Sequence, residues 1–440
     1  MKTYDVVVIG AGPGGLAAAT AAAREGAGVA LLERENYAGG ILNQCVHDGF
    51  GLVRYNKQLG GPEYADRAKA EAAAEGVNAI LGTIVTDIEK TPDGFGVSTI
   101  NETYSAKAIV LATGCRERTR GMISIPGSRP AGIYTAGVAQ NLINMKNVMV
   151  GRRVVIYGTG DIGLIMARRL TLEGAEVICA IEVRDNASGL TRNVRQCLED
   201  YDIPVYLGHK ITNIYGKQRL QAIDIEPVSG GQPRRIECDT LVLSVGLIPE
   251  NEVAETAGIK LDGMTNGIIT DETLMSTEAG AFACGNCRAV MDLADFVSEQ
   301  GEMAGANAAR YAKGKPLLKW EKNPHNLATK GIPEPGTVVC TYCPKGCEIK
   351  ISGGIEGNGC KRGIEFAEQE LVDPHRMFTG TVKVKGAKTT LLPVRSDHLV
   401  PLSEMKQIAE RVRNIEVTCP VKAGDVILAE LGIVAETDSL

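Results

Sequence analysis

Apolar and polar residues follow one another in blocks at the start of the chain, in an order that predicts a strand, a helix and a second strand. The run from Tyr4 to Ile9 is almost continuously apolar, as in a parallel strand buried on both faces. A glycine turn, an alanine-rich segment and another apolar run that ends in Glu33 come next. This βαβ pattern predicts an α/β fold with helices on both faces of a parallel sheet.

The pattern occurs a second time from Arg153, where a strand, a glycine turn, a helix and a strand ending in Glu182 follow in the same order. Two Rossmann-like dinucleotide-binding domains are therefore predicted. The strands that close on LATG, residues 111–114, and on LSVG, residues 243–246, are each followed by a polar turn. We interpret these turns as crossover points between the two domains.

The rest of the chain predicts one more strand and helix, a linker and a small domain. A strand is predicted at Ala281–Ala283, followed by a helix through Phe296, Met303 and Ala308. Prolines and glycines in residues 319–335 predict the linker. Beyond it, short β-like runs surround a helix predicted near residues 403–412, which together indicate a separate small α+β domain.

The first glycine turn has the spacing of a dinucleotide site. Gly10 permits the tight turn, Gly12 lets the backbone approach a pyrophosphate, and Gly15 lets the helix pack closely on the strand. Glu33 ends the next strand 23 positions after Gly10, where its carboxylate can accept hydrogen bonds from both ribose hydroxyls of an adenosine. The alternative is a glycine-rich packing turn.

The second glycine turn is formed by Gly158, Gly160 and Gly163, and Glu182 lies 24 positions after the first of them. A carboxylate at this place bonds a free ribose 2′-hydroxyl and repels a 2′-phosphate, which favours NAD(H) over NADP(H). Arg184 is the group that could meet a phosphate instead. A fold that binds some other adenine nucleotide without passing hydride is a further alternative.

Charge and composition exclude several kinds of partner. The net charge is −6 with acidic and basic residues interspersed, so no basic field is available for nucleic acid or an anionic membrane surface. The first apolar run is too short to span a bilayer and lacks the features of a signal peptide, so we expect a cytoplasmic protein without membrane insertion. Twelve cysteines in a reducing compartment favour metal or redox chemistry where their spacing suits ligands.

Four cysteines have such a spacing near the C-terminal end, with the pattern Cys-x2-Cys-x3-Cys-x12-Cys formed by Cys340, Cys343, Cys347 and Cys360. Three thiolates in a short loop and a distant fourth can enclose a [4Fe-4S] cluster. Zinc is the alternative, since four thiolates also make a closed tetrahedral site. Zinc sites usually pair two CxxC knuckles, and the motif has one, which favours the cluster. The spacing resembles the iron-sulfur segment of molybdopterin oxidoreductases.

The motifs GAGPGG, Gly39-Gly40, LATG and FACGN occur in an order that resembles the two-dinucleotide-binding-domain flavoproteins, which include the pyridine nucleotide disulfide oxidoreductases. The resemblance covers residues 1–315. It implies FAD at the first site and a nicotinamide nucleotide at the second, in an NAD domain inserted in the FAD domain. The additional cofactor-binding positions that it implies are Gly40, Thr113, Gly114, Gly246, Gly285 and Asn286. Asn286 stands where the family usually carries an aspartate, so it brings no charge to the flavin ribityl chain.

Family members that reduce disulfides place a redox cysteine pair shortly after the two glycines. In this chain Cys45 stands alone, and Leu42 and His47 occupy the spacings of such a pair. A dithiol mechanism through this segment is therefore not expected. His47 and Cys45 are the weak candidates for chemistry beside the flavin, and a purely structural role is the alternative for each.

The implied domain boundaries are 1–117 and 247–318 for the FAD domain, 118–246 for the NAD(H) domain, 319–335 for the linker and 336–440 for the Cys-cluster domain. The full set of motifs, including GGILNQC and LATGCRERTR, resembles flavoprotein subunits of multi-component dehydrogenases, among them those associated with glycerol 3-phosphate dehydrogenase in anaerobes. Residues 336–440 resemble a domain fused to such flavoproteins or encoded beside them.

This resemblance implies a subunit that relays electrons between NAD(H), FAD and an iron-sulfur cluster, in a hetero-oligomer with a second flavoprotein dehydrogenase subunit. A flavin suits this junction because it accepts a hydride and releases electrons singly. Two alternatives stay open. One is a stand-alone NADH oxidase or acceptor reductase with structural zinc, and the other is a non-catalytic nucleotide-binding scaffold subunit.

Overall fold

A computed structural model describes residues 2–320 and 328–439 of the chain. Contacts between residues divide it into two compact units. The first comprises residues 1–45, 50–116 and 247–323, and the second comprises residues 46–49, 117–246 and 324–440. The chain thus leaves the first unit and returns to it, as expected for one dinucleotide fold inserted in another. Residues 321–327 of the predicted linker lie outside the described residues.

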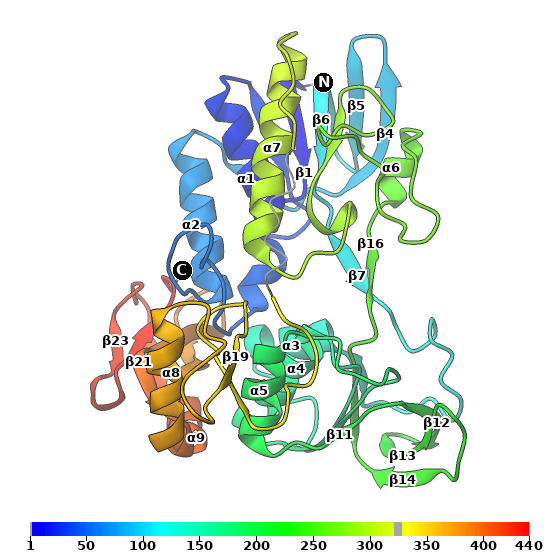
Figure 1. Cartoon of the computed structure of the whole chain (residues 1–440). Coiled ribbons are helices and arrows are strands. Elements are labelled where there is room, and N and C mark those ends of the chain that lie inside the picture. Colours follow the sequence, from blue (N-terminus) through cyan, green and yellow to red (C-terminus); the bar gives the residue numbers. More distant parts are fainter. Residues whose placement is uncertain (1, 321–327, 440) are drawn as a thin grey trace. The chain divides into compact units, whose positions relative to one another are not determined.

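The first unit is built on a seven-stranded sheet (Figure 1). Its strand order is β3-β2-β1-β6-β5-β4, and β17 pairs with the C-terminal end of β6 at residues 109–111. The strands are β1 (Lys2–Ile9), β2 (Val29–Leu32), β3 (Ala79–Ile80), β4 (Val85–Thr91), β5 (Gly94–Thr99), β6 (Thr103–Leu111) and β17 (Ala281–Ala283). β1 runs parallel to both β2 and β6, and its second half is fully buried, as the apolar run predicts.

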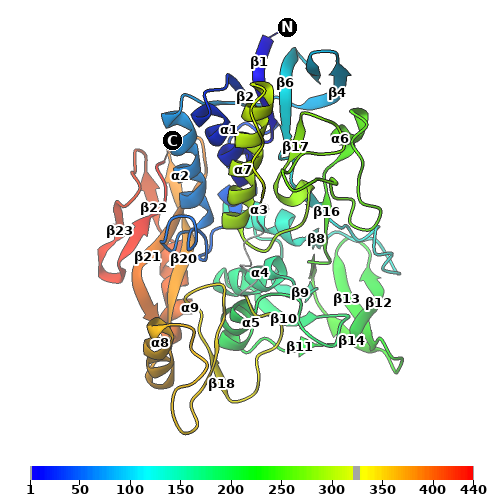
Figure 2. The same cartoon turned by 45° about the horizontal axis from the view of Figure 1, so that its top comes forward.

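Helices α1 (Pro13–Arg24) and α7 (Ala294–Ala312) lie side by side in this unit (Figures 1 and 2). Their backbones approach so closely that a Cβ on Gly301 would collide with the carbonyl of Gly14. This close packing explains why both helices are rich in alanine and glycine. The unit also contains α2 (Gly61–Ala74), α6 (Glu252–Thr256) and the short 3-10 helices η1 (Gly40–Gln44) and η3 (Gly285–Cys287).

The second unit begins with a five-stranded parallel sheet of order β11-β10-β9-β15-β8. Its elements are β8 (Ile133–Thr135), α3 (Ala136–Lys146), β9 (Arg153–Tyr157), α4 (Asp161–Leu172), β10 (Glu176–Ile181), α5 (Thr191–Cys197), η2 (Glu199–Tyr201), β11 (Val205–Tyr206) and β15 (Thr240–Leu243). An antiparallel meander of β12 (His209–Gly216), β13 (Leu220–Pro227) and β14 (Arg234–Glu237) joins β11 to β15. β7 (Cys115–Glu117) and β16 (Leu247–Pro249) pair at the two predicted crossover points.

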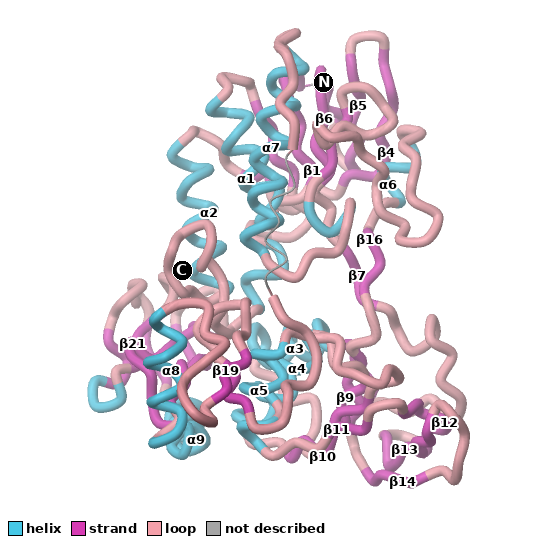
Figure 3. Tube along the Cα trace, viewed as in Figure 1, coloured by secondary structure: helices cyan, strands magenta, loops and turns pink. Residues whose placement is uncertain are grey.

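The C-terminal residues form the predicted small α+β domain. Two short strands, β18 (Thr337–Val339) and β19 (Glu348–Lys350), precede α8 (Lys361–Val372), and Figure 3 shows that loop makes up most of the chain around β19. A five-stranded sheet follows, with order β22-β20-β21-β24-β23. Its elements are β20 (His375–Lys385), β21 (Leu391–Pro401), η4 (Leu402–Glu404), α9 (Met405–Arg413), β22 (Glu416–Thr418), β23 (Val426–Leu428), η5 (Ala429–Leu431) and β24 (Ile433–Ala435).

This C-terminal sheet shares its core with the second Rossmann fold. Phe378, Val382 and Ile408 belong to the same buried cluster as Leu164 and Leu170 of α4. A buried ion-pair network also joins the two parts, in which Arg376 at the start of β20 holds Asp200 and Glu370 at 2.6 and 2.7 Å. The C-terminal residues are therefore packed into the second unit, whereas the sequence pattern predicts a separate small domain.

Candidate functional site

The first glycine turn is shaped to admit a phosphate. Gly10 has a φ of +100°, and a Cβ there would lie 2.5 Å from the carbonyl oxygen of Ala112. A Cβ on Gly15 would collide with the carbonyl of Gly10. Within the described part of the chain, by contrast, no atom lies within 4 Å of a Cβ built on Gly12, which precedes the first turn of α1 without a side-chain cap. The helix N-terminus thus faces open space, as an anionic group requires.

Glu33 ties the end of β2 to this turn. Its buried carboxylate accepts hydrogen bonds from the amides of Ala11 at 2.7 Å and Glu35 at 2.8 Å. Each oxygen uses one of its acceptor positions in this way, so both retain capacity for a pair of ribose hydroxyls.

Three more predicted cofactor positions surround the turn. Gly40 approaches it so closely that a Cβ there would lie 3.0 Å from the Cα of Gly12. The buried hydroxyl of Thr113 faces the thiol of Cys287, which is a weak hydrogen-bond partner. Gly114 has a φ of +74° and, in the same part of the structure, open space where a Cβ would stand. A buried hydroxyl with only a weak partner beside an open glycine turn fits a polar cofactor, because buried polar groups in native proteins are otherwise well bonded.

Gly285 and Asn286 lie in η3. The amide of Gly285 bonds the side chain of Gln300 at 3.1 Å. The Asn286 amide nitrogen lies 3.4 Å from the sulfur of Cys115, and its oxygen accepts from the backbone of Met291 at 3.0 Å. The predicted bond from Asn286 to a ribityl hydroxyl therefore requires either that Asn286 gives up Cys115 or Met291, or that it uses its second N–H or the second lone pair of its oxygen.

The cysteines next to this turn are core residues. Cys284 and Cys287 are buried, and burial raises the pKa of both thiols. Cys287 donates to the carbonyl of Leu111 at 3.3 Å. A thiol with a raised pKa is a poor nucleophile at neutral pH, which argues against redox chemistry at this CGNC.

The two weak catalytic candidates have unreactive surroundings. Burial raises the pKa of Cys45 to about 12, and its thiol donates to the carbonyl of Ile41 at 3.2 Å. Burial lowers the pKa of His47 to about 4, helped by the positive charges of Arg168 and Arg192 and opposed by Asp48. His47 belongs to the second unit, where it contacts α4 residues in a small pocket, and it is neutral at pH 7. Neither residue is tuned for proton transfer or nucleophilic attack near neutral pH.

The second glycine turn repeats the geometry of the first. Gly158 has a φ of +99°, and a Cβ on Gly158 would collide with the carbonyl of Ser244. A Cβ on Gly160 would lie 3.4 Å from the Ser244 hydroxyl, and Gly163 donates its amide to that hydroxyl at 3.1 Å. Gly246, which lies just after β15, has a φ of +109°, and its carbonyl accepts a hydrogen bond from the amide of Arg118 at 3.0 Å.

Glu182 holds this turn as Glu33 holds the first. Its buried carboxylate accepts from the Thr159 amide at 3.0 Å, the Thr159 hydroxyl at 2.6 Å and the Ser188 hydroxyl at 3.3 Å. The other oxygen accepts from the amide of Arg184 at 3.1 Å. The sequence pattern identifies Glu182 but not Thr159, Ser188 or Ser244; the only signal for them is a polar residue inside or just after each turn.

The cysteine motif is folded around β18 and β19. The amide of Cys340 donates to the carbonyl of Cys347 at 2.9 Å, which closes the loop that carries Cys343. Cys360 immediately precedes α8 and is exposed. The pKa of Cys340 is raised to about 11, mainly by burial and also by the nearby thiols of Cys343, Cys347 and Cys360, so the four sulfurs share one neighbourhood. Among the described residues, no three His, Cys, Asp or Glu side chains are arranged to hold a metal ion as they stand.

A short chain of hydrogen bonds connects the second glycine turn to this cysteine loop. Gly189 donates its amide to the carbonyl of Thr159 at 2.8 Å and accepts from the amide of Gly331 at 3.1 Å. Two residues earlier, the hydroxyl of Thr329 donates to the carbonyl of Gly346 at 2.9 Å, between the second and third cysteines of the motif. The nucleotide fold and the cysteine loop are thus fastened through residues 188–191 and 329–331.

Among the helices of the described residues, none has the length and apolar content to cross a membrane.

Comparison with known proteins assigns the family. Residues 4–311 match the family model "Pyridine nucleotide-disulphide oxidoreductase", and residues 361–435 match "Protein of unknown function (DUF1667)". The chain is 27% identical over 289 residues to a thioredoxin reductase of Treponema pallidum (strain Nichols), which covers 65% of this chain and 89% of that protein. It is 25% identical over 292 residues to ferredoxin--NADP reductase 2 of Bacillus velezensis, covering 65% of this chain and 85% of the relative.

A solved structure gives the same result. The crystal structure of T. acidophilum thioredoxin reductase superposes with a TM-score of 0.62 at 25% identity, over 71% of this chain and 99% of that one. The predicted α/β fold with two dinucleotide-binding folds and an additional small C-terminal domain is confirmed. The chain belongs to the pyridine nucleotide-disulphide oxidoreductase family and is an FAD-dependent NAD(P)H oxidoreductase.

Proposed function

We propose that this chain is the NAD(H)-linked FAD subunit of a multi-subunit dehydrogenase, in which it relays electrons between nicotinamide, flavin and a [4Fe-4S] cluster. Its partner is a second flavoprotein subunit that oxidises glycerol 3-phosphate, and the two form a hetero-oligomer. The cluster ligands are Cys340, Cys343, Cys347 and Cys360.

The observation that carries the proposal is the attachment of the cysteine loop to the second nucleotide fold. Thr329 bonds the loop at Gly346, and its neighbour Gly331 bonds Gly189, which in turn bonds Thr159 of the glycine turn. A purely structural metal site would need no such connection to a nucleotide-binding turn. A cluster that exchanges electrons with a nucleotide-dependent centre benefits from being held rigidly in the same folded unit.

Residues of the first unit hold the FAD. The open N-terminus of α1 at Gly12 receives the pyrophosphate, Glu33 binds the ribose, and the buried Thr113 hydroxyl bonds a polar group of the cofactor. When bound, the flavin accepts two electrons as a hydride and releases them one at a time, which nicotinamide cannot do.

Residues of the C-terminal domain fit a thiolate-bound cluster in their chemistry. Cys340, Cys343 and Cys347 lie on one closed loop, and Cys360 stands at the N-terminus of α8, where the helix dipole favours a thiolate. Gly346 has a φ of +57°, which lets the loop turn between the second and third cysteines. Zinc remains the competing occupant, since it takes the same ligands.

Glu182 favours NAD(H) at the second site. Its carboxylate is buried and is fixed by four donors from Thr159, Ser188 and Arg184. A negative charge held in this position opposes a 2′-phosphate. Arg184 contributes its backbone amide to this arrangement.

Reduction of a protein disulfide, the reaction that the name of the thioredoxin reductase relatives denotes, is disfavoured for this chain. The cysteines nearest the first glycine turn, Cys284 and Cys287, are buried thiols with raised pKa values. Cys45 has no second cysteine at the spacing of the expected pair. Thiolate exchange requires an accessible sulfur with a pKa near the ambient pH.

Anaerobic purification of the whole chain tests the proposal. We expect the absorption spectrum to show flavin peaks on a broad shoulder at about 400 nm, and we expect NADH to bleach both features. The purified chain should also contain bound iron and sulfide. The variant Cys343→Ser should lose the iron and keep the flavin, whereas the control Cys419→Ser, outside the motif, should keep both. Bound zinc with NADH-dependent flavin bleaching would identify a stand-alone reductase instead, and a flavin that NADH does not bleach would identify a scaffold.

The substrate and the partner need a separate measurement. Glycerol 3-phosphate should reduce the flavin of this chain only when the second flavoprotein is present, and a tagged chain should retain that subunit through size-exclusion chromatography. Reduction of the isolated chain by glycerol 3-phosphate would contradict the division of labour between the two subunits.

A further inference from the structure

Two buried guanidinium groups share a single carboxylate in the second unit. The Nη1 of Arg168, in α4, lies 3.8 Å from Oδ1 of Asp48, and the Nη2 of Arg192, in α5, lies 3.4 Å from Oδ2. The side chain of Arg168 is 6% exposed, that of Arg192 is 3% exposed and that of Asp48 is 8% exposed. Two positive charges and one negative charge leave an excess of one positive charge, which is costly in a buried site.

Neighbouring acids are already matched with other cations. Arg169, the next residue of α4, forms an ion pair with Glu173 at 2.7 Å. Asp200 and Glu370 are bound by Arg195 and Arg376, and the more exposed Glu199 also pairs with Arg195, so that network contains two cations and three anions. None of these carboxylates is within salt-bridge distance of Arg168 or Arg192 among the ion pairs of the described residues.

The same neighbourhood contains buried polar atoms without partners. Three of them come from α4 and α5 and have no hydrogen-bond partner among the described residues: Nε of Arg168, Nε of Arg192 and Oγ1 of Thr191. The Arg168 guanidinium also donates to the carbonyl of Met377 at 2.7 Å and faces the Tyr201 hydroxyl. Buried polar atoms in native proteins are almost always bonded, so a group of unpartnered ones indicates a bound water or ion.

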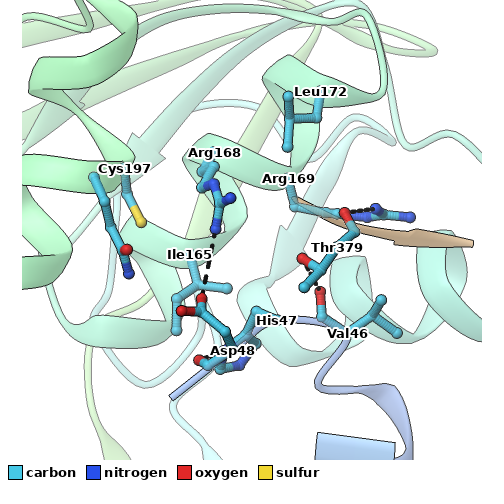
Figure 4. A pocket seen from close by; sticks show the side chains of 10 residues that line it. Val46, His47, Asp48, Ile165, Arg168, Arg169, Leu172, Cys197 and Thr379 are labelled. Atoms are coloured by element: carbon cyan, nitrogen blue, oxygen red, sulfur yellow. Dashed lines mark hydrogen bonds and ion pairs between the residues drawn. The ribbon is translucent and has the colours of Figure 1, made fainter. Parts of the chain in front are cut away.

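A small pocket lies beside Arg168, with room for about one water molecule. Its wall includes His47, Asp48, Ile165, Arg168, Cys197 and Thr379. Figure 4 shows the Arg168 side chain directed at Asp48, with Ile165 close to Asp48. His47 adds no further positive charge, since it is neutral near pH 7.

We propose that this pocket binds a single halide ion, held by Arg168 and compensating the excess charge of the Arg168, Arg192 and Asp48 group. A water molecule could satisfy a donor but would leave the charge unbalanced. Phosphate, sulfate and carboxylates are too large for a space of this size. The halide site goes beyond the proposed function and depends neither on the cluster nor on the partner subunit.

Thermal unfolding of the FAD-loaded full chain tests the site. Chloride or bromide replaces gluconate at constant ionic strength, so that only the size of the anion changes. A ligand that binds only the native state raises the midpoint temperature of unfolding as the ligand concentration increases, by a few degrees when the concentration is well above Kd. We expect this rise in the wild type and its loss in Arg168→Gln, in which one cation and one anion remain.

Arg54→Gln is the control, because the Arg54 side chain is 11% exposed and paired with Glu71 and Glu302 but does not line this pocket. It should lower the midpoint in every salt and keep the halide dependence. Arg192→Gln provides a second charge-removing variant should Arg168→Gln fold poorly. In crystals grown with bromide, an anomalous peak should stand beside Nε of Arg168. The proposal is overturned if the wild-type midpoint is the same in all salts, or if its halide dependence persists in both Arg168→Gln and Arg192→Gln.

Discussion

The hydroxyl of Thr329 donates a hydrogen bond of 2.9 Å to the carbonyl of Gly346, and so fastens the cysteine loop to the segment that packs on the second glycine turn. The same hydroxyl lies 3.1 Å from the carbonyl of Lys345. The single hydroxyl proton is shared between these two carbonyls, and the Lys345 carbonyl also accepts from the Thr329 amide at 3.2 Å. The bond links two features that are far apart in the sequence, a nucleotide fold centred near residue 160 and the cysteine motif near residue 345.

Replacing this hydroxyl should loosen the cysteine loop. Thr329→Val keeps the side-chain shape but removes the donor, which costs about 1 kcal/mol of stability because the Gly346 carbonyl loses this bond, whereas Lys345 keeps the Thr329 amide. We expect faster loss of bound metal to a chelator than in the wild type. Thr337→Val is the control, since Thr337 bonds the carbonyl of Glu334 in the same small sheet but outside this connection. Equal metal loss from both variants would show that Thr329 has no special role.

Two glycines of the first turn should separate folding from cofactor binding. Gly12→Ala places its Cβ in open space, so the protein should fold but bind FAD at least about ten-fold more weakly, because the methyl group occupies the path of the pyrophosphate. Gly15→Ala would drive its Cβ into the carbonyl of Gly10, so it should lower the thermal midpoint itself. Flavin absorbance and circular dichroism measure the two effects. Full flavin occupancy in Gly12→Ala would place the pyrophosphate elsewhere.

The nucleotide preference should depend on the charge of Glu182. Glu182→Gln keeps the side-chain shape and the bonds to Thr159 but removes the negative charge and the acceptor for the Arg184 amide. We expect the ratio of kcat/KM for NADH over NADPH to fall about ten-fold. Glu176→Gln, at the exposed start of the same strand, should leave the ratio unchanged. Stopped-flow reduction of the flavin by each nucleotide gives the ratio. An unchanged ratio in Glu182→Gln would assign nucleotide selection to another residue.

Acid should destabilise the second unit through Glu370. Although burial opposes its charge, Arg376 and Arg195 keep its pKa below the ordinary value of 4.5. A lowered pKa means that the carboxylate stabilises the native state above pH 4.5 and that this contribution is lost as the pH falls through the folded value. Glu370→Gln should therefore cost about 3 kcal/mol at pH 7, in the range for breaking a buried pair, and progressively less towards pH 3.

Urea unfolding at pH 7 and at pH 3 to 5 measures this difference. Glu199→Gln is the control, because Glu199 pairs with Arg195 at 36% side-chain exposure, where an ion pair contributes little. A destabilisation by Glu370→Gln that is independent of pH would mean that the loss of packing, and not of the charge, is responsible.

Much of the fold and of the cofactor sites follows from the sequence. The two glycine turns, Glu33 and Glu182, and the strand at Ala281–Ala283 with the helix after it occur where the patterns predict them. The reason is local: a GxGxxG turn needs glycine at each close approach, so the spacing alone specifies the backbone. Thr159, Ser188 and Ser244 could not be predicted, because their roles depend on which polar atoms the fold brings to the turns.

The α/β class, both nucleotide turns and the spacing of the four cysteines can be read from the amino-acid sequence, because periodicity and spacing act over a few residues. What depends on distant partners is set by the folded structure. It joins the core of the C-terminal sheet to α4, bonds Thr329 to Gly346, and buries His47 and Asp48 against Arg168 in the second unit, although Cys45 and Phe50 on either side belong to the first. Burial and charge at such places are sums over residues remote in the chain, so no local pattern contains them.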